Sequence, residues 1–118
     1  MPITLSNHQD ITIIHPVGRI TLGDGDQELG EAVRTVLAQG TRKILINFGR
    51  TTTLDSSGIG ELVGCYTSIL NRGGQLKLCA LNTRAFNLMK LTSLNSVFEV
   101  LDTEAEALAA FPVAEAVR

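Results

Sequence analysis

The chain has 118 residues, of which 44% are hydrophobic and 19% are charged, as expected for one folded domain rather than a disordered segment. Ten basic and twelve acidic residues give a formal net charge of −2, so the basic footprint of a nucleic-acid binder is missing. No apolar run approaches the roughly 18 residues of a membrane span, and the first residues do not resemble a signal peptide. We therefore expect a single cytoplasmic domain over residues 1–118 that does not bind nucleic acid or insert into membranes.

The residue types available for chemistry are few. Cys65 and Cys79 form neither a disulfide scaffold nor a metal pattern, and we expect both to pack in the core. The sequence has no Trp, one Tyr and two His, and it lacks the phosphate-binding loop and the nucleophile elbow of common enzymes. Because no nucleophile is paired with a base, we expect no enzymatic activity, no cofactor and no metal.

The first part of the chain reads as two strands and a helix. The strands are β-branched runs joined by a polar turn, at residues 3–6 and 11–17. Pro16 cannot donate a ladder hydrogen bond, so it is expected at an edge or at a strand end. After a loop over residues 18–27, apolar residues at helical spacing predict a helix over about 27–39 with Asp26 as its cap. Gly40 is expected to end that helix in a left-handed conformation.

The second part continues the alternation of strands and helices. The short branched segment 43–48 predicts a strand that is buried on both faces. A second helix is expected from Asp55 or Ser56 to about residue 71, and its predicted apolar stripe is Ile59, Leu62, Val63, Tyr66, Ile69 and Leu70. The remaining predicted elements are a strand at 75–80, a helix at 83–91, a strand at 97–101 and a last helix opened by the capping-box pair Thr103 and Glu106.

This order of elements calls for right-handed crossovers and a largely parallel sheet. Because the first two strands are joined by a short turn, that pair can be antiparallel. We therefore predict an α/β fold with a mixed, mostly parallel β-sheet of four to five strands and about four helices. Phe86, Leu88 and Met89 either plug the open end of this sheet or form an exposed apolar ridge, and the first reading is favoured.

The most informative segment, LDSSGIG at residues 54–60, lies where the most buried strand leads into the second helix. Asp and Ser are favoured at helix N-termini because their oxygens accept otherwise unpaired backbone N–H groups. The N-terminus of a helix also carries positive partial charge and accommodates anions. Phosphorylation of Ser56 would add roughly −1.5 to −2 charges there. We expect such a change to alter the surface while the fold persists.

A simpler reading is that Asp55, Ser56 and Ser57 only cap a helix. Two features favour a functional role. Gly58, Gly60 and Gly64 fall in the first turns of the helix, where each interior Gly costs about 0.8–1 kcal/mol relative to Ala, so a close approach by the sheet or by a partner is indicated. The threonines at 51–53 surround the same place with small hydroxyls and no catalytic base.

The stretch TLDSSGIGELVG, between KILINF and GGQLKLCAL, resembles the STAS domain of anti-sigma factor antagonists over nearly the whole chain. The element D-S-[ST]-G-[LIV]-G is more specific for this superfamily than for any one branch. The resemblance implies that an anti-sigma factor that is also a serine kinase phosphorylates Ser56, with Asp55 beside it and Ser57 completing the motif. It also implies that the unphosphorylated form sequesters the anti-sigma factor and frees a sigma factor, and that a PP2C-type phosphatase restores this form.

The loop after the second strand departs from the family pattern. Family members often have Gly-x-Leu-Asp there, whereas this chain has Thr21 in place of the Asp and a longer loop. The resemblance implies that this loop lies near the phosphorylation site and contributes to the partner surface, so the identity of the kinase stays open. The expected partner-binding residues are Thr21, Asp24, Asp55, Ser56, Ser57 and Gly58.

A second function remains open, because STAS domains also occur in anion transporters, lipid-transport systems and stress-sensing assemblies. The chain would then be an accessory or ligand-sensing module of such a complex. Since no membrane span is encoded here, that role requires a separate partner chain. In either case we expect the module to fold as a monomer.

Overall fold

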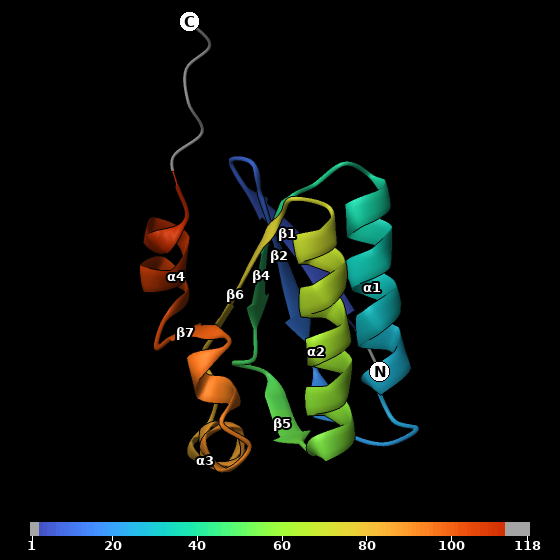
Figure 1. Cartoon of the computed structure of the whole chain (residues 1–118), viewed down its shortest axis with the longest axis vertical. Coiled ribbons are helices and arrows are strands. Elements are labelled where there is room, and N and C mark those ends of the chain that lie inside the picture. Colours follow the sequence, from blue (N-terminus) through green and yellow to red (C-terminus); the bar gives the residue numbers. More distant parts are fainter. Residues whose placement is uncertain (1–2, 113–118) are drawn as a thin grey trace, which may run out of the picture.

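A five-stranded sheet runs through the middle of the protein (Figure 1). In spatial order its strands are β1 (Ile3–His8), β2 (Ile11–Pro16), β4 (Lys43–Asn47), β6 (Gln75–Cys79) and β7 (Glu99–Leu101). β1 is antiparallel to β2, and the other neighbours are parallel, which confirms the predicted mixed, mostly parallel sheet. The computed structural model describes residues 3–112. Residues 1–2 and 113–118, which the predicted single domain also includes, lie outside the described residues.

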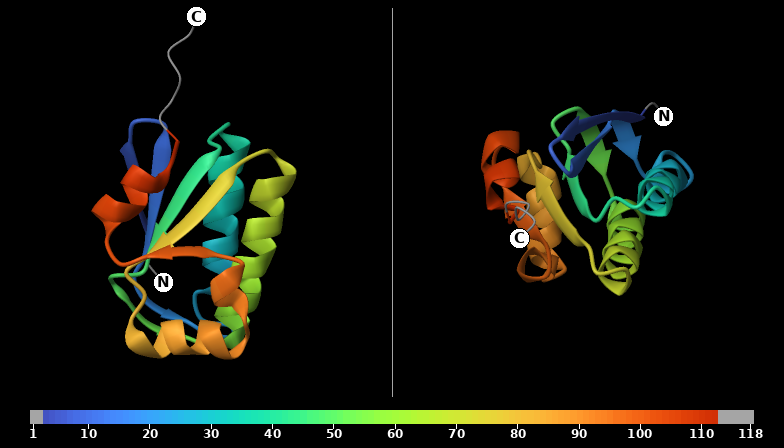
Figure 2. Two further views of the ribbon diagram at one scale, coloured as in Figure 1. Left: turned by 60° about the vertical axis from the view of Figure 1, so that its left-hand side comes forward. Right: turned by 90° about the horizontal axis from the view of Figure 1, so that it is seen from above.

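Residues 3–112 form four helices around the sheet, in agreement with the predicted number. α1 (Asp26–Ala38) and α2 (Ser56–Asn71) lie side by side on one face, and α4 (Glu104–Ala110) covers the other (Figure 2). α3 (Thr83–Leu91) runs across the end of the molecule at which α2 begins, and a short 3-10 turn, Leu94–Ser96, follows it (Figure 1). No helix within residues 3–112 has the length and apolar character that crossing a membrane requires.

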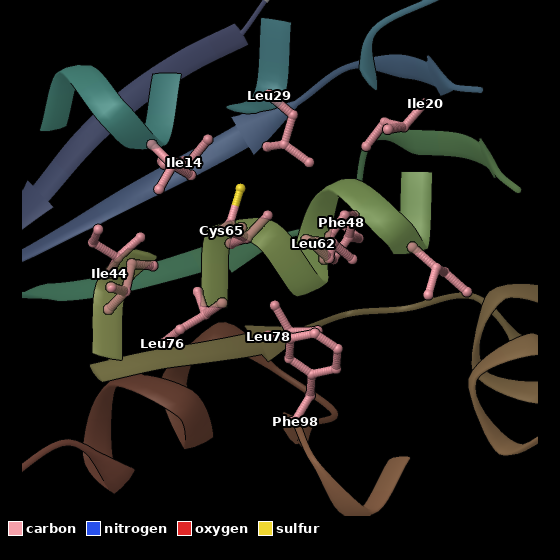
Figure 3. Close-up of a cluster of buried hydrophobic side chains, with 14 of the residues drawn as sticks. Ile14, Ile20, Leu29, Ile44, Phe48, Leu62, Cys65, Leu76, Leu78 and Phe98 are labelled. Atoms are coloured by element: carbon pink, nitrogen blue, oxygen red, sulfur yellow. The ribbon is translucent and has the colours of Figure 1, made fainter. Parts of the chain in front are cut away.

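The larger core lies between the sheet and the α1–α2 pair. Residues of the central strands alternate between the two faces of the sheet, since successive side chains on a strand point in opposite directions. Ile44 and Ile46 therefore face α1 and α2, whereas Leu45 between them faces α4, and all three are fully buried. Side chains that meet on the α1–α2 side include Ile14, Leu29, Ile44, Leu62, Cys65, Leu76 and Leu78 (Figure 3).

A smaller core lies beneath α4. Its buried members are Ile11, Ile13, Leu45, Cys79, Ala107 and Phe111. Lys77 borders it with only 8% of its surface exposed, because its Nζ donates to Glu99 Oε1 at 2.6 Å and lies 5.0 Å from the centre of the Phe111 ring. Both cysteines are buried, as predicted, one in each core.

Two short strands occupy segments where the sequence analysis predicts no strand. β3 (Gly18–Ile20) and β5 (Thr51–Leu54) pair in parallel as a separate two-stranded sheet. Neither has the alternation of apolar residues that identifies a strand, since β3 has three residues and β5 begins with three threonines. The two strands are stabilised by pairing with each other and by burial of Ile20 and Leu54. Neither effect can be predicted from the few residues of one strand alone.

Most predicted element ends agree with the structure. Pro16 is the last residue of β2, Gly40 has a φ of 96°, and α4 opens with the expected capping box between Thr103 and Glu106. The cap of α1 is a correction, because Gly25 with a φ of 90° occupies the N-cap, and Asp26 is the first helical residue. The Asp26 side chain accepts only from the N–H of the next residue, Gln27, so it does not bridge to the following turn.

Two further expectations need correction. The strand predicted from residue 97 begins at Glu99, because the 3-10 turn precedes it. On α2, Val63 and Leu70 point to solvent with 37% and 48% of their surface exposed, although they belong to the predicted apolar stripe. On α3, Met89 is fully buried in the larger core and Leu88 packs against that core, as the favoured reading predicts. Phe86 is half-buried and joins neither core.

Candidate functional site

The candidate site lies at the end of the molecule where β5 leads into α2 (Figure 1). Three segments meet there: the start of α2, the loop over residues 21–25, and one face of α3. Parallel strands direct the loops that follow them to one edge of a sheet, and the segments after β3, β5 and β6 all gather at this edge.

Asp55 connects the first two of these segments. Its Oδ1 accepts from the backbone N–H of Gly58 at 3.0 Å, which caps α2 as predicted. Its Oδ2 accepts from the N–H of Leu22 at 3.3 Å, and its own N–H donates to the carbonyl of Ile20 at 3.3 Å. Both carboxylate oxygens are thus engaged, and the half-buried Asp55 positions its neighbours.

Ser56 is the first residue of α2, and its side chain is exposed. Ser57 beside it is half-buried, so the two adjacent hydroxyls differ in accessibility. Gly58 is buried under β3, where an added Cβ would lie 2.6 Å from the carbonyl oxygen of Ile20. The close approach expected at this glycine is therefore confirmed, and it locks the first turn of α2 against β3.

Gly60 and Gly64 differ from Gly58. Both are exposed. Apart from the adjacent residues and the backbone of α2 itself, no atom of residues 3–112 lies within 4 Å of the position that a Cβ would take at either. At these two positions no side chain projects from the outer face of α2, so its backbone is accessible. Of the two explanations given for the glycines, approach by the sheet holds for Gly58 alone.

The loop that carries Thr21 and Asp24 closes on itself as a tight turn. Each of these two residues donates its backbone N–H to the carbonyl of the other at 2.8 Å. The turn is brought to the start of α2 by the hydrogen bond from Leu22 to Asp55. The carboxylate of Asp24 lies 3.6 Å from the exposed guanidinium of Arg19. All six expected partner-binding residues thus lie within two segments joined by Asp55.

A third segment was not expected at the site. An open hollow of about 780 Å³ lies beside Ser56, and we call it the α2–α3 hollow. Its lining is residues 53–56 on one side and Thr83, Arg84, Asn87, Leu88 and Leu91 of α3 on the other. The Asn82 side chain, which caps α3, donates to the carbonyl of Thr52 at 3.4 Å and so joins α3 to β5.

Large apolar side chains are exposed near this end of the molecule. Leu22, at the tip of its turn, is 77% exposed, and Leu91, at the end of α3, is 84% exposed. Exposed apolar side chains that gather around polar groups are typical of surfaces that bind other proteins. The spacing of residues 84, 87, 88 and 91 shows one face of α3, but only the three-dimensional fold places that face beside Ser56.

The groups at the site suit docking better than catalysis. Among the residues that line the α2–α3 hollow, the titratable ones are Asp55 and Arg84, and the Asp55 carboxylate is held by two backbone N–H groups. The thiols lie in the cores, and burial raises the pKa of Cys65 to about 12 and that of Cys79 to about 11. An exposed hydroxyl on a rigid helix end can accept a group from another protein.

Comparisons with known proteins agree with this geometry. Residues 2–107 match the STAS domain family. An anti-sigma F factor antagonist of Paenibacillus polymyxa is 22% identical over 108 residues, which is 92% of each chain. A crystal structure of an anti-sigma factor antagonist from Mycobacterium paratuberculosis superposes with a TM-score of 0.82, at 21% identity over 92% of each chain.

A third relative, the Bacillus anti-sigma factor antagonist SpoIIAA, has structures in two states. The unphosphorylated form superposes with a TM-score of 0.70 at 22% identity, covering 92% of this chain and 96% of that one. For the phosphorylated form the TM-score is 0.69 at 21% identity, covering 92% and 97%. Because the family match covers residues 2–107, the chain belongs to the STAS domain family.

Proposed function

We propose that this protein is an anti-sigma factor antagonist that acts by phosphorylation-controlled partner switching. In its unphosphorylated form it binds an anti-sigma factor that is also a serine kinase, and a sigma factor is released. The kinase transfers the γ-phosphoryl group of ATP to Ser56. An O–P bond forms at Oγ, the bond to the β-phosphate breaks, and ADP and the hydroxyl proton leave. A PP2C-type phosphatase reverses the modification by hydrolysis.

The exposure of Ser56 at the start of α2 carries this proposal. A kinase can reach this hydroxyl without unfolding the helix, because the cap is supplied by Asp55 and not by Ser56. The positive end of the α2 dipole offsets part of the added charge. The fold is then expected to persist, as in SpoIIAA, whose two forms resemble this chain almost equally.

The partner surface that we propose combines the start of α2 with the tight turn over residues 21–25. Thr21 and Asp24 shape that turn, and Asp55 fixes it against Ser56. Gly60 and Gly64 extend the surface along α2 and allow another protein to approach its backbone. A dianion in the centre of such an interface would oppose binding, because burying it against a surface that offers it no opposite charge is costly.

Mass spectrometry after incubation with the cognate kinase and ATP tests this function. We expect one phosphate on the chain, located at Ser56 by peptide analysis, and none on the Ser56→Ala variant. Ser68→Ala is the matched control, since it removes a half-buried serine hydroxyl of α2 outside the expected partner-binding residues, and this variant should still accept the phosphate. A wild-type protein that stays unmodified, or that is labelled only elsewhere, contradicts the proposal.

The identity of the partner distinguishes the proposed function from an accessory role in a transport or stress-sensing complex. Capture of cellular proteins on the unmodified chain, followed by mass spectrometry, should recover a serine kinase with anti-sigma activity. Recovery of a transporter subunit in its place would favour the accessory role. The cytoplasm, where sigma factors act, is the compartment that fits the proposed function.

A further inference from the structure

Arg84 lies across the α2–α3 hollow from Ser56. It is the second residue of α3, and both side chains line the same hollow of about 780 Å³. Within residues 3–112, Arg84 makes no ion pair and no side-chain hydrogen bond, and it is exposed. A long, flexible cation that has no partner within residues 3–112 therefore lines the same hollow as the hydroxyl that we propose to be phosphorylated.

The stability of α3 does not explain a cation at this place. The first turn of a helix carries positive partial charge and disfavours Arg or Lys, whereas the last turn favours them. Lys90 lies in the last turn of α3, where its Nζ also lies 5.4 Å from the centre of the Phe86 ring. Lys90 thus has two local reasons for its position, and Arg84 has neither.

The net charge around the hollow goes from about zero to strongly negative when Ser56 is modified. Before modification they are the Asp55 carboxylate, held by the N–H groups of Gly58 and Leu22, and the Arg84 guanidinium. A phosphate adds roughly two negative charges next to that carboxylate, which repels it. The guanidinium is the group lining the hollow that can compensate, and its planar fork matches two phosphate oxygens at once.

We propose that Arg84 holds the phosphate of Ser56, drawing it across the hollow toward α3. This inference rests on the proposed function only in so far as Ser56 is the modified residue. The phosphorylated state then differs from the unmodified one in more than charge. The phosphate and Arg84 close over the apolar side chains of Leu88 and Leu91, and α3 becomes tied to the start of α2. A partner that docks on this end would meet a covered hollow.

Phosphorus NMR of protein that carries phosphoserine at position 56 tests the pairing. The phosphoserine is inserted during translation, so no kinase is needed. The second pKa of a phosphoserine is ordinarily about 6. A guanidinium beside the phosphate favours the dianion, so we expect this pKa to be lowered by roughly half a unit or more. In the Arg84→Gln variant it should return toward the ordinary value.

Arg72→Gln provides the matched control, because Arg72 is an equally exposed arginine at the opposite end of α2. It alters the net charge as Arg84→Gln does, yet it should leave the phosphate pKa unchanged. Equal pKa values in wild type and Arg84→Gln would overturn the proposal. A pKa that rises equally in both variants would also overturn it, since net charge alone would then account for the effect.

A second measurement follows the Arg84 side chain directly. The Nε–H signal of Arg84 should shift in nitrogen–proton NMR spectra when phosphoserine replaces Ser56, and an unshifted signal would contradict the pairing. The two proposals fail separately. If no kinase modifies Ser56, the proposed function is lost while these spectra still measure the pairing. If the spectra show no pairing, Ser56 phosphorylation is unaffected as a mechanism.

Discussion

At the scale of single residues, the motif combines positions that build the site with positions that leave it open. Asp55 and Gly58 are structural: the first caps α2 and holds the turn at Leu22, and the second admits the backbone of β3. Within residues 3–112, the Ser56 side chain makes no hydrogen bond and Gly60 admits no neighbouring segment, and both residues are exposed. The motif therefore contains two kinds of residue: those that stabilise the start of α2 and those that are available to contact a partner.

Alanine substitution of two glycines on α2 tests this division. Gly58→Ala should lower the free energy of unfolding by about 1–3 kcal/mol, because the new methyl group overlaps the Ile20 carbonyl and the Leu54 side chain. Gly60→Ala should raise it by about 0.5–1 kcal/mol, since the site is open and Ala is the better helix former. Urea denaturation measures both changes. Equal effects of the two substitutions would contradict the division.

At the scale of elements, the two faces of the sheet are covered unequally. Two long helices cover one face, whereas the single short helix α4 covers the other (Figure 2). α4 is held by its capping box, by Ala107 and by Phe111, whose ring also contacts the buried Lys77. Because few apolar contacts fix it, α4 is expected to open more readily than α1 or α2.

Phe111→Ala should detach α4 and expose the core beneath it. Loss of a buried Phe costs about 3–5 kcal/mol, and Phe111 belongs to this small core. Cys79 lies under α4 and Cys65 lies on the opposite side, so a thiol reagent reports on each face separately. Reaction at Cys79 should accelerate at least about tenfold, while Cys65 stays protected.

Phe86→Ala is the matched control for this experiment. It truncates a half-buried Phe of α3, which is also stacked with a lysine, but it leaves α4 in place. Cys79 should stay protected in this variant. Acceleration at both cysteines in Phe111→Ala would indicate global unfolding and would contradict a separate role for α4.

The main sheet and the four helices could be predicted from the sequence because their signals are local. Apolar residues at helical spacing, the Thr103 capping box and Gly40 each mark an element without knowledge of the rest. β3 and β5 could not be found this way, since each is defined by the other. The sequence does not identify Arg84 as a site residue for a related reason. Arg84 and Ser56 line the same hollow only because α3 crosses the end of the molecule.

At the scale of the whole molecule, the residues that stabilise the fold and the residues proposed to bind a partner lie in different places. The buried side chains form two cores on either side of the sheet, while Ser56, the turn over residues 21–25 and the outer face of α3 gather at one end. Ser56, where the charge would be added, is exposed and belongs to neither core. The protein can therefore change its surface without changing its fold, and this is the physical requirement for switching between partners.

The affinity of the anti-sigma factor for the unmodified chain and for the chain with phosphoserine at position 56 tests this central claim most directly. Calorimetric titration should show weaker binding of the modified chain by about 1–3 kcal/mol, or roughly 5–150-fold. Backbone NMR spectra of the two forms should differ only near the site. Equal affinity at full phosphorylation, or spectral changes throughout both cores, would contradict the account.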